Sequence, residues 1–214
     1  MTHKFKTRFT ALILTLLLCP ISSALAQGNE LIAKAKSYLN PSQGLQIEYQ
    51  LKTDHQETPS TGLYYALGNA FYLESEEIKA WHDGQGNLWV YLAMNGEVNL
   101  TRPQREDLQE LNPLLNLDLL SPSRFYLKER REGPLRILTA TPKQPRKEYI
   151  EWLELQTDPQ GKPVALRLRQ VGMDETLHLK IIRITQKANK AMKEKDFFSF
   201  SPNKLPGTPV IDLR

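Results

Sequence analysis

Gln46-Ile47-Glu48-Tyr49-Gln50-Leu51-Lys52 is the stretch of sequence that decides the fold. Polar and apolar side chains alternate in it without exception. Because successive side chains of a β-strand point to opposite faces of the sheet, this period of two indicates a strand with one buried face. The chain around it is therefore expected to contribute further strands to the same sheet.

Short segments of the same kind recur along the chain and are separated by turn residues. Before position 102 the expected strands are 62–67, 71–74, 78–82, 88–92 and 98–101. After position 124 they are 125–129, 135–141, 148–157, 163–171, 176–184 and 197–200. The short spacing predicts an antiparallel meander, preceded by a helix from Asn29 to Asn40 that Pro41 ends.

The alternation stops between Arg102 and Arg124. Residues 103–111 are expected to form a short polar helix. Asn112-Pro113 then has the pattern of a helix N-cap followed by proline at the first helical position. The leucines that follow lie almost all round this second helix, so it must be buried or must cover an apolar surface; they are Leu114, Leu115, Leu117, Leu119 and Leu120.

The first 26 residues have the pattern of a secretory signal peptide. Lys4, Lys6 and Arg8 precede an apolar run over residues 9–18, and Ala24-Leu25-Ala26 is a small-residue cleavage site. We therefore expect cleavage after Ala26 and a single domain over residues 27–214. Cys19 leaves a second interpretation open, in which it is the lipidated residue of an anchored lipoprotein, although the large Leu18 before it fits that pattern poorly.

Charge excludes one class of function. The signal segment holds three of the 28 basic residues and no acidic residue, so the secreted chain keeps 25 basic against 24 acidic residues and its net charge falls from +4 to +1. A nucleic-acid-binding protein is expected to carry a basic footprint, which is missing here. Cys19 is the only cysteine, so the secreted chain is expected to have no disulfide and no thiol chemistry.

The sequence also contains none of the common catalytic or metal-binding patterns. His55, His82 and His178 are the only histidines after the signal segment, and their spacing does not match the close ligand pairs of zinc sites. The sequence has no Gly-x-Ser-x-Gly elbow and no phosphate-binding loop. We predict a protein that is not an enzyme and uses no metal or cofactor, while a triad assembled from distant strands stays open.

Apolar side chains on alternating strand positions are the main feature of the secreted chain. They make either the core of a closed sandwich or, with the leucine-rich helix as a lid, a cavity for acyl chains. Under the second interpretation the cavity is expected to be lined by Ile47, Tyr49, Leu51, Leu63, Tyr65, Phe71, Leu73, Leu88, Val90 and Leu92, with Leu114, Leu117 and Leu120 on the lid. A shift of one residue in any strand would exchange its lining residues for their neighbours.

The order of these parts resembles the outer-membrane lipoprotein carrier family, the LolA-like periplasmic chaperones. The similar pieces, which together span nearly the whole secreted chain, are the starting helix, the strand Ile47 to Leu51, Asp83-Gly84 followed by Leu88-Trp89-Val90-Tyr91, the segment 138–143, and the ending 198–202 through Pro206-Gly207 to Val210-Ile211-Asp212.

This resemblance implies a mainly β fold with a few helices, an incomplete antiparallel β-barrel whose hydrophobic cavity has a helical lid. It also implies a monomeric periplasmic carrier with three partners: acylated lipoproteins, an inner-membrane exporter and an outer-membrane receptor. An envelope-stress sensor or protein-interaction module on the same fold, or an anchored lipoprotein receptor, stays the alternative. Two adjacent positions depart from the family pattern, since Leu67-Gly68 stands where the family has an Arg-Pro pair whose arginine holds the lid shut.

Overall fold

The computed structural model describes residues 21–214. The signal-peptide prediction falls mostly on residues 1–20, which lie outside this range. The first helix, α1, spans Ile21–Tyr38. It begins eight residues before the expected start at Asn29 and ends two before Asn40, so the expected cleavage after Ala26 would remove its first six residues.

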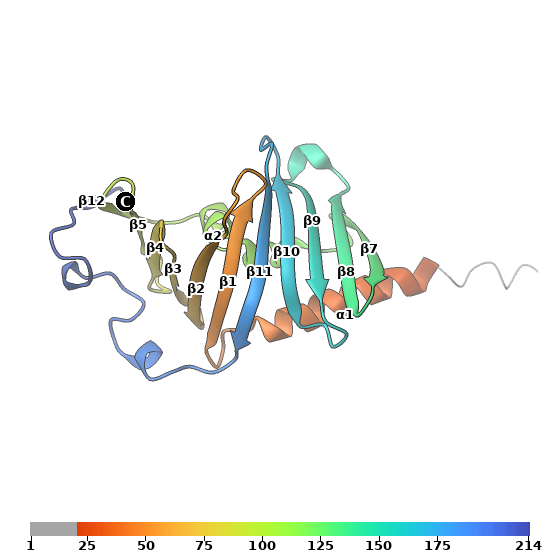
Figure 1. Ribbon diagram of the computed structural model, residues 1–214, viewed down its shortest axis with the longest axis horizontal. Coiled ribbons are helices and arrows are strands. Elements are labelled where there is room, and N and C mark those ends of the chain that lie inside the picture. Colours follow the sequence, from red (N-terminus) through yellow and green to blue (C-terminus); the bar gives the residue numbers. More distant parts are fainter. Residues whose placement is uncertain (1–20) are drawn as a thin grey trace, which may run out of the picture.

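The described residues form one sheet of twelve strands in the order β12-β6-β5-β4-β3-β2-β1-β11-β10-β9-β8-β7 (Figure 1). The strands are β1 (Leu45–Thr53), β2 (Ser60–Leu67), β3 (Ala70–Glu74), β4 (Ile78–His82), β5 (Leu88–Leu92), β6 (Glu97–Thr101), β7 (Phe125–Glu132), β8 (Leu135–Pro142), β9 (Ile150–Thr157), β10 (Pro163–Gln170), β11 (Thr176–Thr185) and β12 (Val210–Asp212).

The sheet contains two antiparallel meanders, β1–β6 and β7–β11, and the spacing of the strands predicts this kind of connection. The pairing of β1 with β11 joins the two meanders. The two outermost strands, β12 and β7, do not pair with each other. The sheet is therefore open, and the predicted fold class, a mainly β protein with an incomplete antiparallel barrel, is confirmed.

The expected strand at 197–200 is wrong. Those residues form no strand, and their aromatic side chains pack instead against rings on the sheet: the Phe197 ring lies 5.5 Å from that of Tyr65, and the Phe200 ring 5.3 Å from that of Trp81. The segment after β11 passes outside β1–β5, and its last strand β12 pairs in parallel with β6 (Figure 1). The aromatic residues of this segment thus pack on a face of the sheet and do not pair at its edge.

The helices cover one face of the sheet, which we call the inner face. Helix α1 buries Leu31 and Ala35 completely and approaches β7 and β8 closely at Gly28, where an added Cβ would lie 3.4 Å from Leu127 and Leu138. The inner face itself carries the main hydrophobic core, which extends from Phe71 on β3 across β1 to Phe125 on β7. The opposite face is called the outer face below.

The two helices expected between the meanders are present. Helix α2 spans Arg105–Leu111, and the leucine-rich helix is a 3-10 helix, η1, over Pro113–Leu119. Asn112 caps η1 as predicted, because its Oδ1 accepts a hydrogen bond from the Leu114 backbone N–H at 3.1 Å. Short 3-10 turns also occur at Pro145–Lys147 (η2), Ala191–Lys193 (η3) and Pro202–Lys204 (η4).

Gly62 on β2 is required by its neighbour on β1. It pairs with Tyr49, whose ring lies over it, and an added Cβ would lie 2.3 Å from the Tyr49 ring. Tyr49 is 7% exposed, so its ring has little room to move away. A glycine in the middle of a strand thus marks a close approach of a side chain to the backbone.

We predict that Gly62→Val destabilises the fold by about 1–3 kcal/mol, the cost typical of overpacking, because the new side chain displaces the Tyr49 ring. The measurement is the free energy of unfolding from urea titration. Thr61→Val on the exposed neighbouring position is the control, with an expected change within about 0.5 kcal/mol. Equal effects of the two substitutions would contradict the close packing of Tyr49 on Gly62.

Candidate functional site

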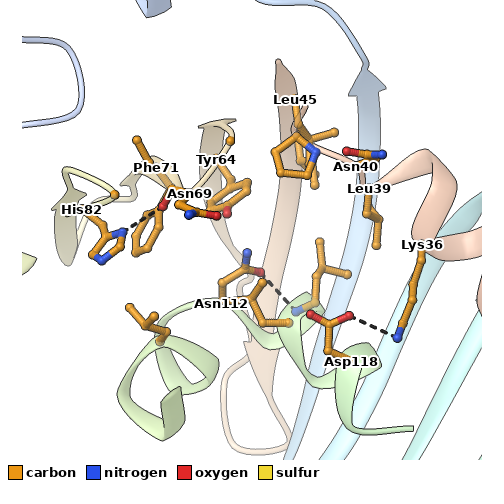
Figure 2. A pocket seen from close by; sticks show the side chains of 18 of the residues that line it. Lys36, Leu39, Asn40, Leu45, Tyr64, Asn69, Phe71, His82, Asn112 and Asp118 are labelled. Carbon is orange, nitrogen blue, oxygen red and sulfur yellow. Dashed lines mark hydrogen bonds and ion pairs between the residues drawn. The ribbon is translucent and has the colours of Figure 1, made fainter. Parts of the chain in front are cut away.

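A cavity of about 860 Å³ lies between the inner face of β1–β3, the C-terminal end of α1 and the helices α2 and η1. Figure 2 shows η1 on one side of this space, with Leu45, Tyr64 and Phe71 on the strands facing it. Its volume is within the range of about 300–1,000 Å³ that is usual for small-molecule sites. The helices α2 and η1, residues 105–119, are called the lid below.

The apolar part of the cavity comes from both the sheet and the lid. The contributing side chains are Leu45, Ile47, Tyr64 and Phe71 on the strands, Leu39 on α1, and Leu108, Leu114, Leu115 and Leu117 on the lid. Most are buried, but Leu39, Leu108 and Leu115 are only partly buried. An apolar ligand entering this space would thus touch leucines on the lid and aromatic rings on the sheet.

The rim of the cavity is polar. Lys36 on α1 and Asp118 on η1 form an ion pair across it, with Nζ and Oδ1 3.1 Å apart (Figure 2). His82 at the end of β4 lies with its Nδ1 2.9 Å from the Asn69 carbonyl oxygen, and its ring stacks on Phe71 at 5.2 Å. The cavity therefore has an apolar interior and an entrance lined by charged and hydrogen-bonding groups.

The lid contains buried polar side chains. Asn116 is completely buried and donates from Nδ2 to the Pro113 carbonyl at 3.0 Å, but its Oδ1 has no hydrogen-bond partner in the described chain, and neither has Nε2 of the buried Gln109. A buried polar atom without a partner costs about 1–3 kcal/mol. The closed position of the lid is thus less stable than its buried leucines alone would make it.

Tyr64 on β2 lies beside the lid. Burial raises the pKa of the Tyr64 hydroxyl to about 12, and the Asn112 side chain near it acts in the opposite direction. Asn112 lies between α2 and η1 and is buried. Tyr64 and Asn112 thus border the same cavity, one from the sheet and one from the lid.

The expected site residues separate into three groups. Ile47, Phe71, Leu114 and Leu117 line the cavity. A second group is buried in the core on the inner face and consists of Tyr49, Leu73, Leu88 and Leu120. Two further residues, Leu51 and Val90, are partly buried against that core. Leu92 lies two residues after Val90 on β5 and pairs with Ile78 on β4. The binding of an acyl chain by any of them stays a prediction.

The expected inward facing of Leu63 and Tyr65 is wrong. In the register of β1 and β2, Ile47 pairs with Tyr64 and Glu48 with Leu63, so Leu63 and Tyr65 lie on the outer face. Tyr65 stacks there on Tyr72 with ring centres 6.2 Å apart. The physical reason is that Leu63-Tyr64-Tyr65-Ala66-Leu67 is apolar on both faces, so alternation alone does not fix which face is buried.

Sequence reasoning also missed Leu45, Tyr64, Leu108 and Leu115, as well as the whole polar rim. Leu45 extends the alternation of β1 by one step, and this signal was available. The rim residues come from four separate loops and helix ends, and no local pattern brings them together.

Gly68, one of the two positions that depart from the family pattern, lies in the turn between β2 and β3. It has φ +59°, which favours glycine, and its N–H donates to the Pro41 carbonyl at 3.1 Å. No arginine reaches the lid from this turn. On β2, Tyr64 lines the cavity beside the lid residues Asn112 and Leu114.

One histidine contacts an acidic residue that is distant from it in the sequence. His178 on β11 contacts Asp54, with Nε2 and Oδ1 2.6 Å apart, and this contact lowers the pKa of Asp54 to about 2. Asp54 follows β1 at the end away from the cavity rim. Among residues 21–214, no group of three or more His, Cys, Asp or Glu side chains is arranged to hold a metal ion.

Comparison with known proteins gives a likeness of fold. An uncharacterised conserved protein of Thermus thermophilus is 13% identical, with a TM-score of 0.54 over 87% of this chain and 99% of that one. A LolA superfamily protein of Nitrosomonas europaea is 11% identical, with a TM-score of 0.41 over 81% of this chain and 97% of that one. MucB of Pseudomonas aeruginosa, solved in complex with MucA, is 13% identical, with a TM-score of 0.42 over 82% of this chain and 63% of that one.

The Thermus thermophilus protein has the same overall architecture, and the open, mainly β sheet agrees with the architecture that the resemblance implies. No protein-family model and no curated protein sequence matches the chain. At these identities the likeness concerns the fold and not a function. Within residues 21–214, no helix is long and apolar enough to span a membrane.

We predict that Tyr64→Phe loosens the lid, because the substitution removes a buried hydroxyl that lies near the lid residue Asn112. Loss of a polar interaction of this kind costs at most about 1 kcal/mol. Hydrogen exchange should become faster in residues 105–119 and stay unchanged in β9 and β10. Tyr65→Phe on the outer face is the matched control, and lid exchange that is equally fast in both variants would contradict this effect of the Tyr64 hydroxyl.

We also predict a loss of stability between pH 10 and 12. Burial raises the pKa of Tyr49 and of Tyr64 to about 12, whereas both ionise near 10 in the unfolded chain. The stabilisation is complete below pH 10 and decreases as the pH rises towards 12, because only the unfolded state releases these protons. Urea midpoints measured from pH 9 to 12 test this, and Tyr64→Phe should show a smaller decrease than the parent protein.

Proposed function

We propose that this protein is a periplasmic carrier that holds the acyl chains of lipoproteins in the cavity under the lid and takes no part in their chemistry. The observation that carries the proposal is the cavity itself, which combines an apolar interior on the inner face of the sheet with a polar rim. An acylated polypeptide has the same two parts. Its chains would lie against the leucines and aromatic rings, and its peptide would leave past Lys36 and Asp118.

Burial of acyl chains supplies enough free energy for such a role. Each buried methylene contributes about 0.8 kcal/mol, so a single chain of roughly 14 methylenes would gain about 11 kcal/mol. A cavity of this volume holds part of a multiply acylated group rather than all of it, which also keeps the cargo releasable. The expected partners are an exporter in the inner membrane and a receptor in the outer membrane.

The lid supports the proposal because few polar contacts attach it. It meets α1 through the Lys36–Asp118 ion pair, whose side chains are 37% and 55% exposed. Exposed ion pairs contribute little, typically below about 1 kcal/mol. The buried leucines Leu114, Leu117 and Leu119 therefore supply most of the free energy that holds the lid closed.

Leu115→Glu tests the proposal. Leu115 lines the cavity and is partly exposed, so a carboxylate there can remain hydrated while it repels an acyl chain. We expect at least tenfold weaker binding of a fluorescent fatty-acyl probe, with an unchanged circular dichroism spectrum. Leu117→Glu is less suitable, because Leu117 is 1% exposed and the charge would destabilise the fold.

Met94→Glu, in the turn between β5 and β6, is the matched control. Met94 is 90% exposed and lies away from the cavity lining, so the same charge there should leave probe binding unchanged. Native mass spectrometry of the secreted protein with lipid extraction would identify any cargo. Failure of the parent protein to bind the acyl probe, together with co-purification of a protein partner and no lipid, would instead favour the sensor or interaction module.

A further inference from the structure

The two meanders carry opposite charge. Residues 54–118, which form β2–β6 and the lid, contain three basic and eleven acidic residues, whereas residues 119–185, which include β7–β11, contain 13 basic and eight acidic residues. The order of the strands places β2–β6 on one side of β1 and β7–β11 on the other (Figure 1). The small net charge of the chain thus conceals a large separation of charge within the molecule.

On the outer face, the strand registers align the basic side chains in rows across β7–β11 and β1. One row consists of Lys128, Thr139, Glu154, Arg167, His178 and Lys52, and the next of Arg130, Ile137, Gln156, Ala165, Lys180 and Gln50. Arg169 lies on the same face, paired with Trp152 and Thr176. Six of these residues are lysine or arginine, and Glu154 is the one carboxylate in the two rows.

Most of this positive charge is not neutralised. Glu154 is shared by two arginines, with its Oε2 2.9 Å from Arg130 Nη2 and its Oε1 3.6 Å from Arg167 Nη1. Arg130 also lies 3.8 Å from Glu132, between Nη2 and Oε2. Lys52, Lys128, Arg169 and Lys180 form no ion pair with any residue between 21 and 214. Nε of Arg169 is buried without a hydrogen-bond partner in that range.

Aromatic side chains accompany the basic ones on this face. The Arg167 guanidinium lies 5.7 Å from the centre of the Trp152 ring, and Lys143 Nζ lies 5.3 Å from that of Tyr126, which is 64% exposed. Tryptophan and tyrosine are enriched where proteins meet the headgroup region of a bilayer, and lysine and arginine are attracted to anionic lipids there.

We propose that the outer face of β7–β11 docks onto the surface of an anionic lipid bilayer. The basic side chains are spread over five strands and do not converge on one cleft, which suits a surface that presents charge over an area better than it suits a bound peptide. The cavity and the lid lie on the inner face, so docking leaves them accessible. The proposal does not depend on the acyl-carrier function.

The test is sedimentation of the secreted protein with vesicles of phosphatidylglycerol and phosphatidylcholine. The first variant replaces three of the unpaired basic residues of the face, those on β7, β10 and β11: Lys128→Gln, Arg169→Gln and Lys180→Gln. The second variant removes the same charge from exposed positions of the C-terminal segment, Lys187→Gln, Lys190→Gln and Lys193→Gln. All proteins share the same N-terminus, so any residual signal segment contributes equally to each.

We expect the parent protein to bind the anionic vesicles in low salt and to be released near 0.5 M salt, where charges are screened within a few ångströms. The face variant should bind at least tenfold more weakly, and the C-terminal variant should bind like the parent. Equal losses in both variants, parent binding to pure phosphatidylcholine, or no parent binding to anionic vesicles would each overturn the proposal. Binding of the fluorescent acyl probe in solution should be the same in all three proteins, which separates this test from that of the carrier function.

Discussion

The double pairing of β1 holds the molecule together. β1 forms ladders with β2 on one side and β11 on the other, and thereby joins two meanders that each would otherwise have an unpaired edge in the middle of the sheet. Its alternating sequence places Ile47, Tyr49 and Leu51 on the inner face, where they contact both halves of the core. A shift of one residue in β1 would expose these three side chains and bury Glu48 and Gln50.

Because the sheet stays open, its inner face must be covered by other elements. The cover over β7 and β8 differs from the cover over β1–β3. Over β7 and β8 the cover is tight, since α1 approaches them at Gly28 and buries Leu31 and Ala35. Over β1–β3 the cover is the lid, which leaves a cavity of about 860 Å³. The packed half supplies stability, and the half under the lid supplies space for a ligand.

The sequence predicted the parts of this arrangement that depend on local pattern. The strands, the capped helix after Asn112 and the open mainly β fold follow from period, turn residues and the family resemblance. The facing of β2 was not predictable from alternation, because Leu63 to Leu67 is apolar on both faces. The polar rim was not predictable either, since Lys36 and Asp118 are 82 positions apart and meet only because α1 and η1 border the same cavity.

Likewise, the contact of Asp54 with His178 depends on the β1–β11 ladder, whereas the sequence offers only the adjacent His55 as a partner. The strand expected at 197–200 failed for a related reason. Its aromatic residues satisfy the pattern of a strand, but the rings of Tyr65, Tyr72 and Trp81 on the outer face offer a better burial than a sheet edge does.

The buried polar atoms of the lid have a physical consequence for a carrier of the kind proposed. Acyl-chain burial at about 0.8 kcal/mol per methylene approaches the limit of non-covalent affinity after roughly 25 methylenes, and cargo bound that tightly would not be released. Gln109 Nε2 and Asn116 Oδ1 lack partners in the described chain while the lid is closed, and each regains hydrogen bonds to water when the lid opens. The closed lid thus carries a cost that opening would remove, and this offsets part of the cost of exposing its buried leucines.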